Sequence, residues 1–135
     1  MGTSILTSTK KLLGIGEDYT HFDLDVITSI NSAFSTLTQL GVGPIDGFSI
    51  VDVTAEWEDY LDDNSKLSLV KSYVYMKVRV IFDPPNTGFV LTAVQEQIKE
   101  AEWRLNVFSE VENYVPEPVS NEPVVPGYEG LYPGL

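Results

Sequence analysis

The chain has 135 residues, 43% of them hydrophobic, and a formal net charge of −12 at pH 7. This length predicts one domain, and no apolar run is long enough to cross a bilayer, so we expect no membrane partner. The absence of cysteine excludes disulfides, thiolate metal sites and a cysteine nucleophile. Because affinity for nucleic acid comes largely from lysine and arginine, the acidity argues against a protein that grips DNA, although an acidic surface suits a place where DNA passes without binding.

Two helices are predicted in the first forty residues. Residues 4–13 have the pattern of a short amphipathic helix, which the following glycines end. Asp23 is the expected N-cap of a second helix that runs to Leu40. The apolar face of this helix holds Val26, Ile30, Ala33, Leu37 and Leu40, widened by Ile27 and Phe34. Its other face is rich in serine, threonine and asparagine, which suits either close packing against a neighbour or exposure to solvent.

The next segment is predicted to contain only short elements. Two glycines and a proline end the second helix near residue 43. Residues 47–53 (GFSIVDV) have a strand-like composition, and we expect a short strand or hairpin there. Thr54 is the expected cap of a small helix that carries Trp57 and Tyr60.

The stretch SYVYMKVRVIFDPPNTGF, which begins at Ser72, fits two secondary structures. Taken alone, its alternating apolar residues are typical of a half-buried strand. Extended back to Lys66 and placed at 100° per residue, the apolar side chains instead form two nearly opposite stripes of one helix. The length of the pattern favours a helix that ends at Asp83, before two prolines. The first stripe holds Leu67, Val70, Val74, Val78 and Ile81, and the second holds Leu69, Tyr73, Met76 and Val80.

A helix with two opposed apolar stripes must be covered on both sides. Either it is the central helix of a bundle, or one stripe packs against another subunit, and the sequence leaves both alternatives open. A head-to-tail contact through such a face would build a ring. The candidates for a subunit interface are Leu69, Tyr73, Met76, Val80 and Trp103.

The last predicted helix begins near Asn86 or Thr87 and ends at about Val107. Trp103 lies off its main apolar face, where it either covers a neighbouring helix or contacts another chain. The apolar face holds Val90, Val94, Ala101, Leu105 and Phe108.

Residues 109–135 differ in composition from the rest of the chain. They hold five of the eight prolines, five acids and no lysine or arginine, which predicts an extended tail without a core of its own. We therefore expect a helical-bundle domain at residues 1–108 and a partner-binding arm at residues 109–135, the alternative being a disordered acidic terminus. The candidate docking residues of this arm are Tyr114, Val124, Val125, Tyr128, Leu131 and Tyr132. The predicted fold is thus mainly all-α: a bundle of about four helices, a strand or hairpin near residues 47–53, and a proline-rich tail.

No residue pattern indicates catalysis or a bound cofactor. His21, the single histidine, alternates with Asp23 and Asp25, and these three residues are a poor ligand set for a structural metal. The acids of residues 59–63 lack the spacing of a calcium loop, and the glycine pairs lack the third glycine of a dinucleotide motif. We expect neither an enzyme nor a metal or cofactor.

The order of segments resembles a known family. It runs from SILTSTKKLLGI through a helix ending in LGVGP, then GFSIVDVTAEWEDYL, LVKSYVYMKVRVIFDPP and FVLTAVQEQIKEAEWRLNV. Between Ser4 and Val107 this order is similar to the head–tail connector proteins of tailed bacteriophages, also called adaptor or head-completion proteins. KSYVYMKVRVIFDPP and AEWRLNV carry most of the resemblance, which rests on helices and turns and on no catalytic signature.

The resemblance implies a structural subunit of a homo-oligomeric ring, commonly of twelve copies. Such a ring docks beneath the portal protein in the virion neck, extends the channel, and presents a surface to the next neck or tail-completion protein. DNA passes through it without specific binding. The protein would be made in the cytoplasm of the host bacterium. The helices at residues 66–83 and 87–107 would supply the bundle core and the inter-subunit faces, and the tail would reach the portal or an adjacent subunit.

An acidic binding protein is the alternative function. It would mimic phosphate and occupy a host protein that binds nucleic acid. Such mimicry needs acids concentrated on one rigid exposed face, whereas the acids of this chain are spread over caps, linkers and tail.

Overall fold

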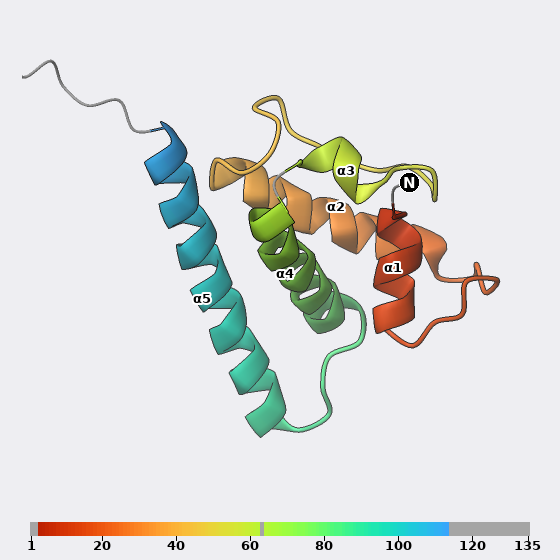
Figure 1. Ribbon diagram of the computed structural model, residues 1–135. Helices are drawn as coiled ribbons and strands as arrows, with labels where there is room; N and C mark the ends of the chain where they lie inside the picture. Colours follow the sequence, from red (N-terminus) through yellow and green to blue (C-terminus); the bar gives the residue numbers. More distant parts are fainter. Residues whose placement is uncertain (1–2, 63, 114–135) are drawn as a thin grey trace, which may run out of the picture.

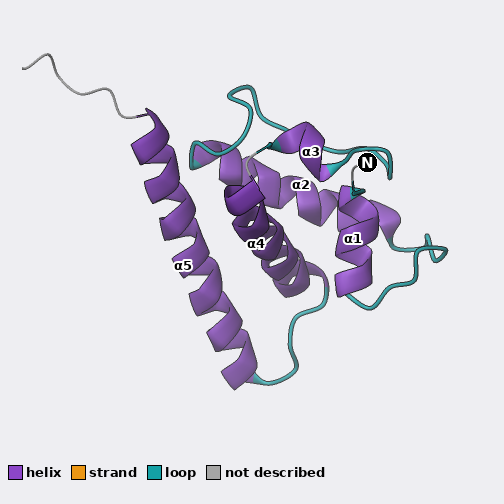
Figure 2. Cartoon of the chain, viewed as in Figure 1, coloured by secondary structure: helices purple, strands orange, loops and turns teal. Residues whose placement is uncertain are grey.

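The computed structural model describes residues 3–62 and 64–113, and this part of the chain is a bundle of helices without a β-strand (Figures 1 and 2). The mainly all-α fold class is therefore confirmed. The helices are α1 (Ile5–Leu12), α2 (Asp23–Gln39), α3 (Trp57–Tyr60), α4 (Asn64–Phe82) and α5 (Gly88–Asn113).

Helix α4 lies at the centre of the bundle. It packs against α2 and α5 and also contacts α1, so that Figure 1 shows it between α5 and α1. The helical interpretation of this segment is confirmed and the strand alternative is wrong. Four residues of the first apolar stripe are buried, but Ile81, in the last turn of the helix, is 53% exposed. The buried four are Leu67, Val70, Val74 and Val78.

The beginning of α2 is held by a buried ion pair. Lys10 of α1 is only 2% exposed, and its Nζ lies 2.7 Å from Oδ1 of Asp23. The same ammonium donates a hydrogen bond to the Glu17 carbonyl oxygen. The expected capping role of Asp23 is wrong by one position: Phe22 is the N-cap residue, and Asp23 stands in the first turn. There its negative charge also favours the helix N-terminus.

The loop between α2 and α3 replaces the predicted strand. Residues 47–53 are irregular, so the expected strand or hairpin is wrong. The backbone of Ile50 pairs with a side chain: its N–H donates to Asn31 Oδ1 at 2.8 Å, and Asn31 Nδ2 donates to its carbonyl at 2.9 Å. One asparagine of α2 thus satisfies the polar groups that a second strand would have satisfied.

A tight backbone approach orients this loop. Gly43 has φ +83°, and a Cβ at this position would overlap the Tyr60 ring. Tyr60 is buried and donates its hydroxyl to the Val42 carbonyl at 3.2 Å. Glycine is required here both for the left-handed backbone and for the close aromatic contact.

The short helix α3 has a different cap from the expected one. Glu56 is its N-cap residue, and the Glu56 N–H donates to Oδ2 of Asp59 at 2.9 Å. Thr54 bonds instead to the Asp52 carboxylate, two residues earlier. Sequence spacing alone did not distinguish the two capping arrangements, because both provide an oxygen acceptor to free N–H groups.

Helix α5 extends beyond its predicted end. Thr87 Oγ1 accepts a hydrogen bond from the Val90 N–H, which agrees with the expected cap. The helix continues past Val107 to Asn113. The expected end of the helix is therefore wrong, and so is the expectation of an extended backbone at residues 109–113. Ser109 is buried, and its hydroxyl donates to the Gly41 carbonyl at 2.9 Å. The first helix-breaking residue after it is Pro116.

Candidate interaction surfaces

The second apolar stripe of α4 is covered largely within the chain. Tyr73 is fully buried, and its hydroxyl donates to Oε2 of Glu102 on α5 at 2.7 Å. Burial, reinforced by the Glu102 carboxylate, raises the pKa of Tyr73 well above its ordinary value. Tyr73 therefore links α4 to α5 and leaves no exposed surface for another subunit. Leu69, Met76 and Val80 are only partly buried against the core.

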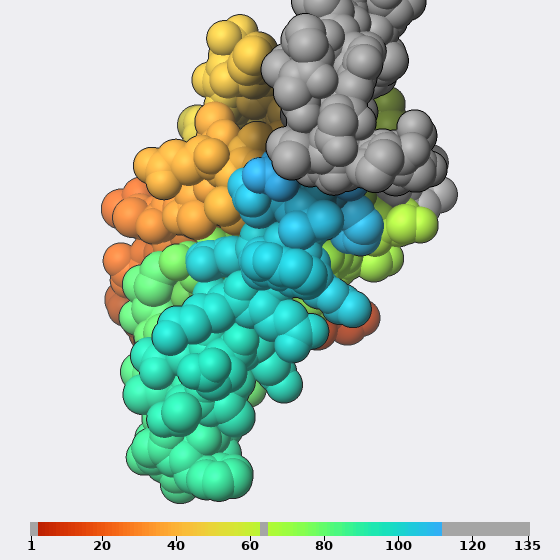
Figure 3. All heavy atoms as spheres, turned by 90° about the vertical axis from the view of Figure 1, so that its left-hand side faces the viewer, coloured from red at the N-terminus to blue at the C-terminus, as the bar shows by residue number. Residues whose placement is uncertain are grey.

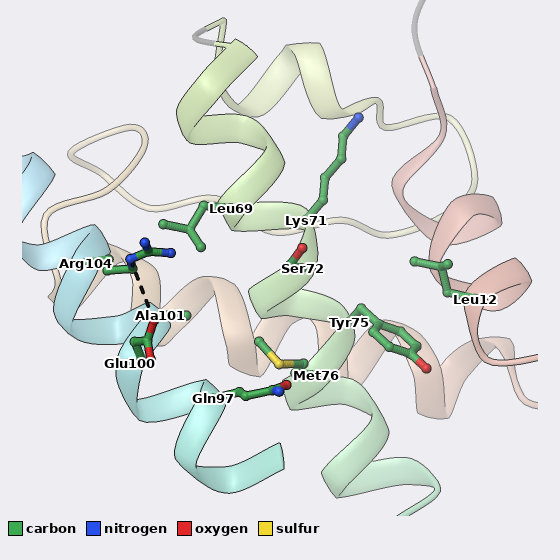
Figure 4. A pocket seen from close by; sticks show the side chains of 10 residues that line it. All are labelled: Leu12, Leu69, Lys71, Ser72, Tyr75, Met76, Gln97, Glu100, Ala101 and Arg104. Carbon is green, nitrogen blue, oxygen red and sulfur yellow. Dashed lines mark ion pairs between the residues drawn. The ribbon is translucent and has the colours of Figure 1, made fainter. Parts of the chain in front are cut away.

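A groove remains open beside the partly buried residues of this stripe. It runs over the exposed side of α4, between α5 and the end of α1 (Figure 4). Apolar side chains from all three helices line it, namely Leu69, Met76, Ala101 and Leu12. Ile5 and Leu6 of α1 are buried in the core, whereas Leu12, at the end of this helix, is 59% exposed and borders the groove. Figure 4 shows Leu12 and Tyr75 facing each other across its far edge.

The groove carries positive charge in an otherwise acidic chain. Lys71 and Arg104 line it together with one acid, Glu100, whose Oε2 lies 3.8 Å from Arg104 Nε. Lys71 Nζ lies over the ring of Trp57, 5.8 Å from its centroid. Helix α4 as a whole contains four of the eight basic residues and none of the twenty acids. Of these four basic residues, Lys71 lines the groove, and the groove lining as a whole has one more cation than acid.

The outer face of α5 is a second candidate surface (Figure 3). Trp103, Val107 and Val111 follow one another at intervals of one helical turn, so they share a stripe. Trp103 is 65% exposed and Val111 69% exposed. Most of the Trp103 side chain is therefore not covered by the neighbouring helices, and its contact with another chain stays a prediction. An exposed apolar stripe of this kind is typical of a protein–protein contact.

A third surface was missed by the sequence analysis. Ile45, Val51 and Val53 are exposed on the loop between α2 and α3, Ile45 to 94%. The Asn31 side chain bonds to the backbone of Ile50, which fixes the loop that carries these exposed side chains. Residues 41–63 also contain seven acids and no base. The strand-like pattern of residues 47–53 was the only signal, and it predicted pairing rather than exposure.

The described residues show no grouping of three or more metal-ligand side chains. His21 lies against Phe22, with ring centroids 4.8 Å apart, and both contribute to an aromatic group with Tyr19. No helix in this part of the chain is both long and apolar enough to span a bilayer. The predicted arm residues, Tyr114, Val124, Val125, Tyr128, Leu131 and Tyr132, lie outside the described residues.

Several exposed apolar surfaces on one small helical bundle are typical of a protein that contacts other chains. A family model described as phage connector protein matches residues 5–112. The chain belongs to the phage connector protein family. Its role is that of a head–tail connector, a structural component of the virion neck that associates with portal and tail proteins. No curated protein and no solved structure matches the chain.

Proposed function

We propose that this chain is the subunit of a closed ring that docks beneath the portal, lengthens the DNA channel and receives the next neck or tail-completion protein. Twelve copies is the number that the family resemblance implies. The ring would contain one subunit type with two different contact surfaces. DNA would pass along its inner wall without specific binding, and the chain would have no catalytic role.

The observation that carries this proposal is the presence of two unlike open surfaces on one subunit. The groove beside α4 is concave and carries Lys71 and Arg104, whereas the outer face of α5 presents Trp103 and Val111. Contacts between unlike surfaces are heterologous, and they close into rings when the rotation allows it. The proposed interface residues are Leu69, Met76, Val80 and Trp103; Tyr73 is excluded because it is fully buried.

The net charge supports the proposed channel. At −12 the subunit repels phosphate, and a ring multiplies this charge around its axis. A wall that bound DNA through lysine and arginine would hold it in place, which a conduit must avoid. The chain would be organised as a bundle domain followed by an arm that contacts the portal or an adjacent subunit. The bundle domain ends after α5, at Asn113, rather than at residue 108.

The mass of the assembled protein tests this proposal. Purified full-length protein, alone and mixed with portal rings of the same phage, is measured by light scattering and imaged in negative stain. We expect a ring in at least one of the two samples. A strict monomer that ignores portal rings would overturn the proposal.

A further inference from the structure

We infer that the groove between α4, α5 and α1 binds residues 114–135 of an adjacent copy of this chain. This inference rests on the proposed ring. In that ring the groove receives the arm of the neighbouring copy and not the outer face of its α5, and the arm contacts the neighbouring subunit rather than the portal. The occupant is thus the segment that follows α5, and the receptor is formed entirely by described residues.

The shape and chemistry of the groove suit an extended peptide. Leu69, Met76 and Ala101 offer apolar contacts, and Tyr75 adds an aromatic side chain. The exposed polar groups of Ser72 on α4 and of the glutamine opposite it on α5 can bond to peptide backbone. Proline-rich segments dock in grooves that combine aromatic walls with a few polar groups, because they lose little conformational entropy on binding. Residues 114–135 contain five prolines.

The charges of groove and segment are complementary. Residues 114–135 contain three acids and no lysine or arginine. The groove has two cations, Lys71 and Arg104, against the single carboxylate of Glu100. Lys71 is partly buried, so an ion pair there is screened less than one in open solvent. The loop of residues 41–63, with seven acids, repels the same segment.

The length and prolines of the segment favour the neighbouring copy over the chain's own groove. Its 22 residues reach about 70 Å at 3.1 Å per residue in an extended form, well beyond a subunit whose longest helix measures about 40 Å. The groove lies back along α5, near Arg104, so binding in the same chain requires the segment to turn back towards the helix that it follows. Pro116 and Pro118 favour extended backbone in the residues before them, which opposes such a turn in the first residues after Asn113.

The absence of cysteine allows a direct test in the full-length protein. Two single variants, Ser72→Cys in the groove and Val124→Cys in the segment, are mixed under assembly conditions and oxidised. We expect a disulfide-linked dimer that contains one of each chain. The matched control replaces Ser72→Cys by Ser35→Cys, an exposed serine of α2, and we expect several-fold less dimer from it.

Three results would overturn the inference. Equal crosslinking of Val124→Cys to Ser72→Cys and to the control Ser35→Cys would show an unspecific contact. No crosslinking to Ser72→Cys in a confirmed ring would place the segment elsewhere. A double variant with both cysteines that gives only an internally crosslinked monomer would show binding within one chain. Because ring formation is measured in the same samples, a ring without the crosslink refutes this inference alone, whereas a strict monomer refutes the proposed ring.

A charge reversal separates specific binding from chance collision. Lys71→Glu is expected to lower the crosslink yield several-fold, because it turns the groove negative towards an acidic segment. Lys99→Glu makes the same change of charge at a site on α5 that is 75% exposed and does not line the groove. Equal loss of crosslinking in both variants would contradict the proposed contact.

Discussion

Helices α4 and α5 are neighbours with opposite environments. Helix α4 lies between α2 and α5, and Val70, Tyr73, Val74 and Val78 along it are fully buried. Helix α5 is longer, yet it buries only one side and leaves Trp103 65% exposed on the other. Apolar content alone therefore does not identify the core of this protein: in α4 it marks positions packed within the bundle, and on the outer face of α5 it marks a surface available to other chains.

Placing a charge in each helix gives the largest expected contrast. Val74→Asp buries an unpaired carboxylate at the centre of the bundle, and we expect a loss of about 5 kcal/mol in the free energy of unfolding, comparable with the whole stability of such a domain. Val111→Asp, on the exposed face of α5, should change it by less than about 0.5 kcal/mol. Urea denaturation followed by circular dichroism measures both. Similar losses in the two variants would erase the distinction between the helices.

A truncation within α5 sharpens the comparison between its two sides. Leu105 is fully buried, whereas Phe89 is 86% exposed. Leu105→Ala removes buried methyl groups and leaves a cavity, so we expect a loss of about 3 kcal/mol, while Phe89→Ala is nearly neutral. Thermal unfolding of the two variants checks the difference. A destabilised Phe89→Ala protein would mean that the outer face is covered within one chain.

The hydrogen bond between the two helices should make stability depend on alkaline pH. Tyr73→Phe leaves Glu102 without its donor, and we expect a loss of about 1–2 kcal/mol near neutral pH. Because burial raises the pKa of Tyr73 in the folded state, its contribution is fully present below about pH 10 and is lost as the pH rises further. The variant should therefore lose less stability than the parent between neutral and alkaline pH.

The matched control for this prediction is Tyr75→Phe. The Tyr75 hydroxyl accepts a hydrogen bond from Arg79 in the same helix and does not reach α5. Urea denaturation below and above pH 10 gives the change of the unfolding free energy with pH. We expect this change to match the parent in Tyr75→Phe and to be smaller in Tyr73→Phe. A change equal to that of the parent in both variants would contradict the assignment to Tyr73, and would leave Tyr60, whose pKa burial also raises, as the alkaline-sensitive group.

The smallest expected effect on stability is also the most informative for assembly. Trp103→Ala should change the free energy of unfolding by less than about 0.5 kcal/mol, because the side chain is exposed in the single subunit. Ring formation should nevertheless weaken. Trp57 is 2% exposed, so a blue shift of the fluorescence on assembly would report mainly on Trp103. An assembled ring with unchanged emission, or normal assembly of the variant, would remove Trp103 from the interface.

Much of the fold was predictable from local pattern, and the errors have physical causes. The helix through Lys66 was recognisable because its apolar residues repeat at helical spacing over a length that exceeds a normal strand. The strand predicted at residues 47–53 does not form, because Asn31 from a distant helix satisfies the backbone of Ile50. The end of α5 was placed too early, because the hydrogen bond between Ser109 and Gly41 joins residues far apart in the sequence.

The candidate surfaces divide in the same way. The exposed Trp103 stood out in sequence because it lies off the apolar stripe of its helix. Tyr73 was predicted to lie at the same interface, yet it is buried. Periodicity shows that a second stripe must be covered, but it does not show whether a helix of the same chain or another subunit covers it. Ile45 and Val51 gave no signal, because their exposure depends on a loop geometry that a distant asparagine and several glycines impose.

Helical periodicity, glycine and proline breaks and the order of segments are local properties, so the helical class, the order of the helices and the connector family could be predicted from the chain alone. The folded bundle was needed to show which side of α4 faces another helix, which side opens into a groove, and that Lys10 meets Asp23. These features depend on contacts between residues distant in the chain, and a helix carries the same apolar stripe whether its own fold or a second subunit covers it.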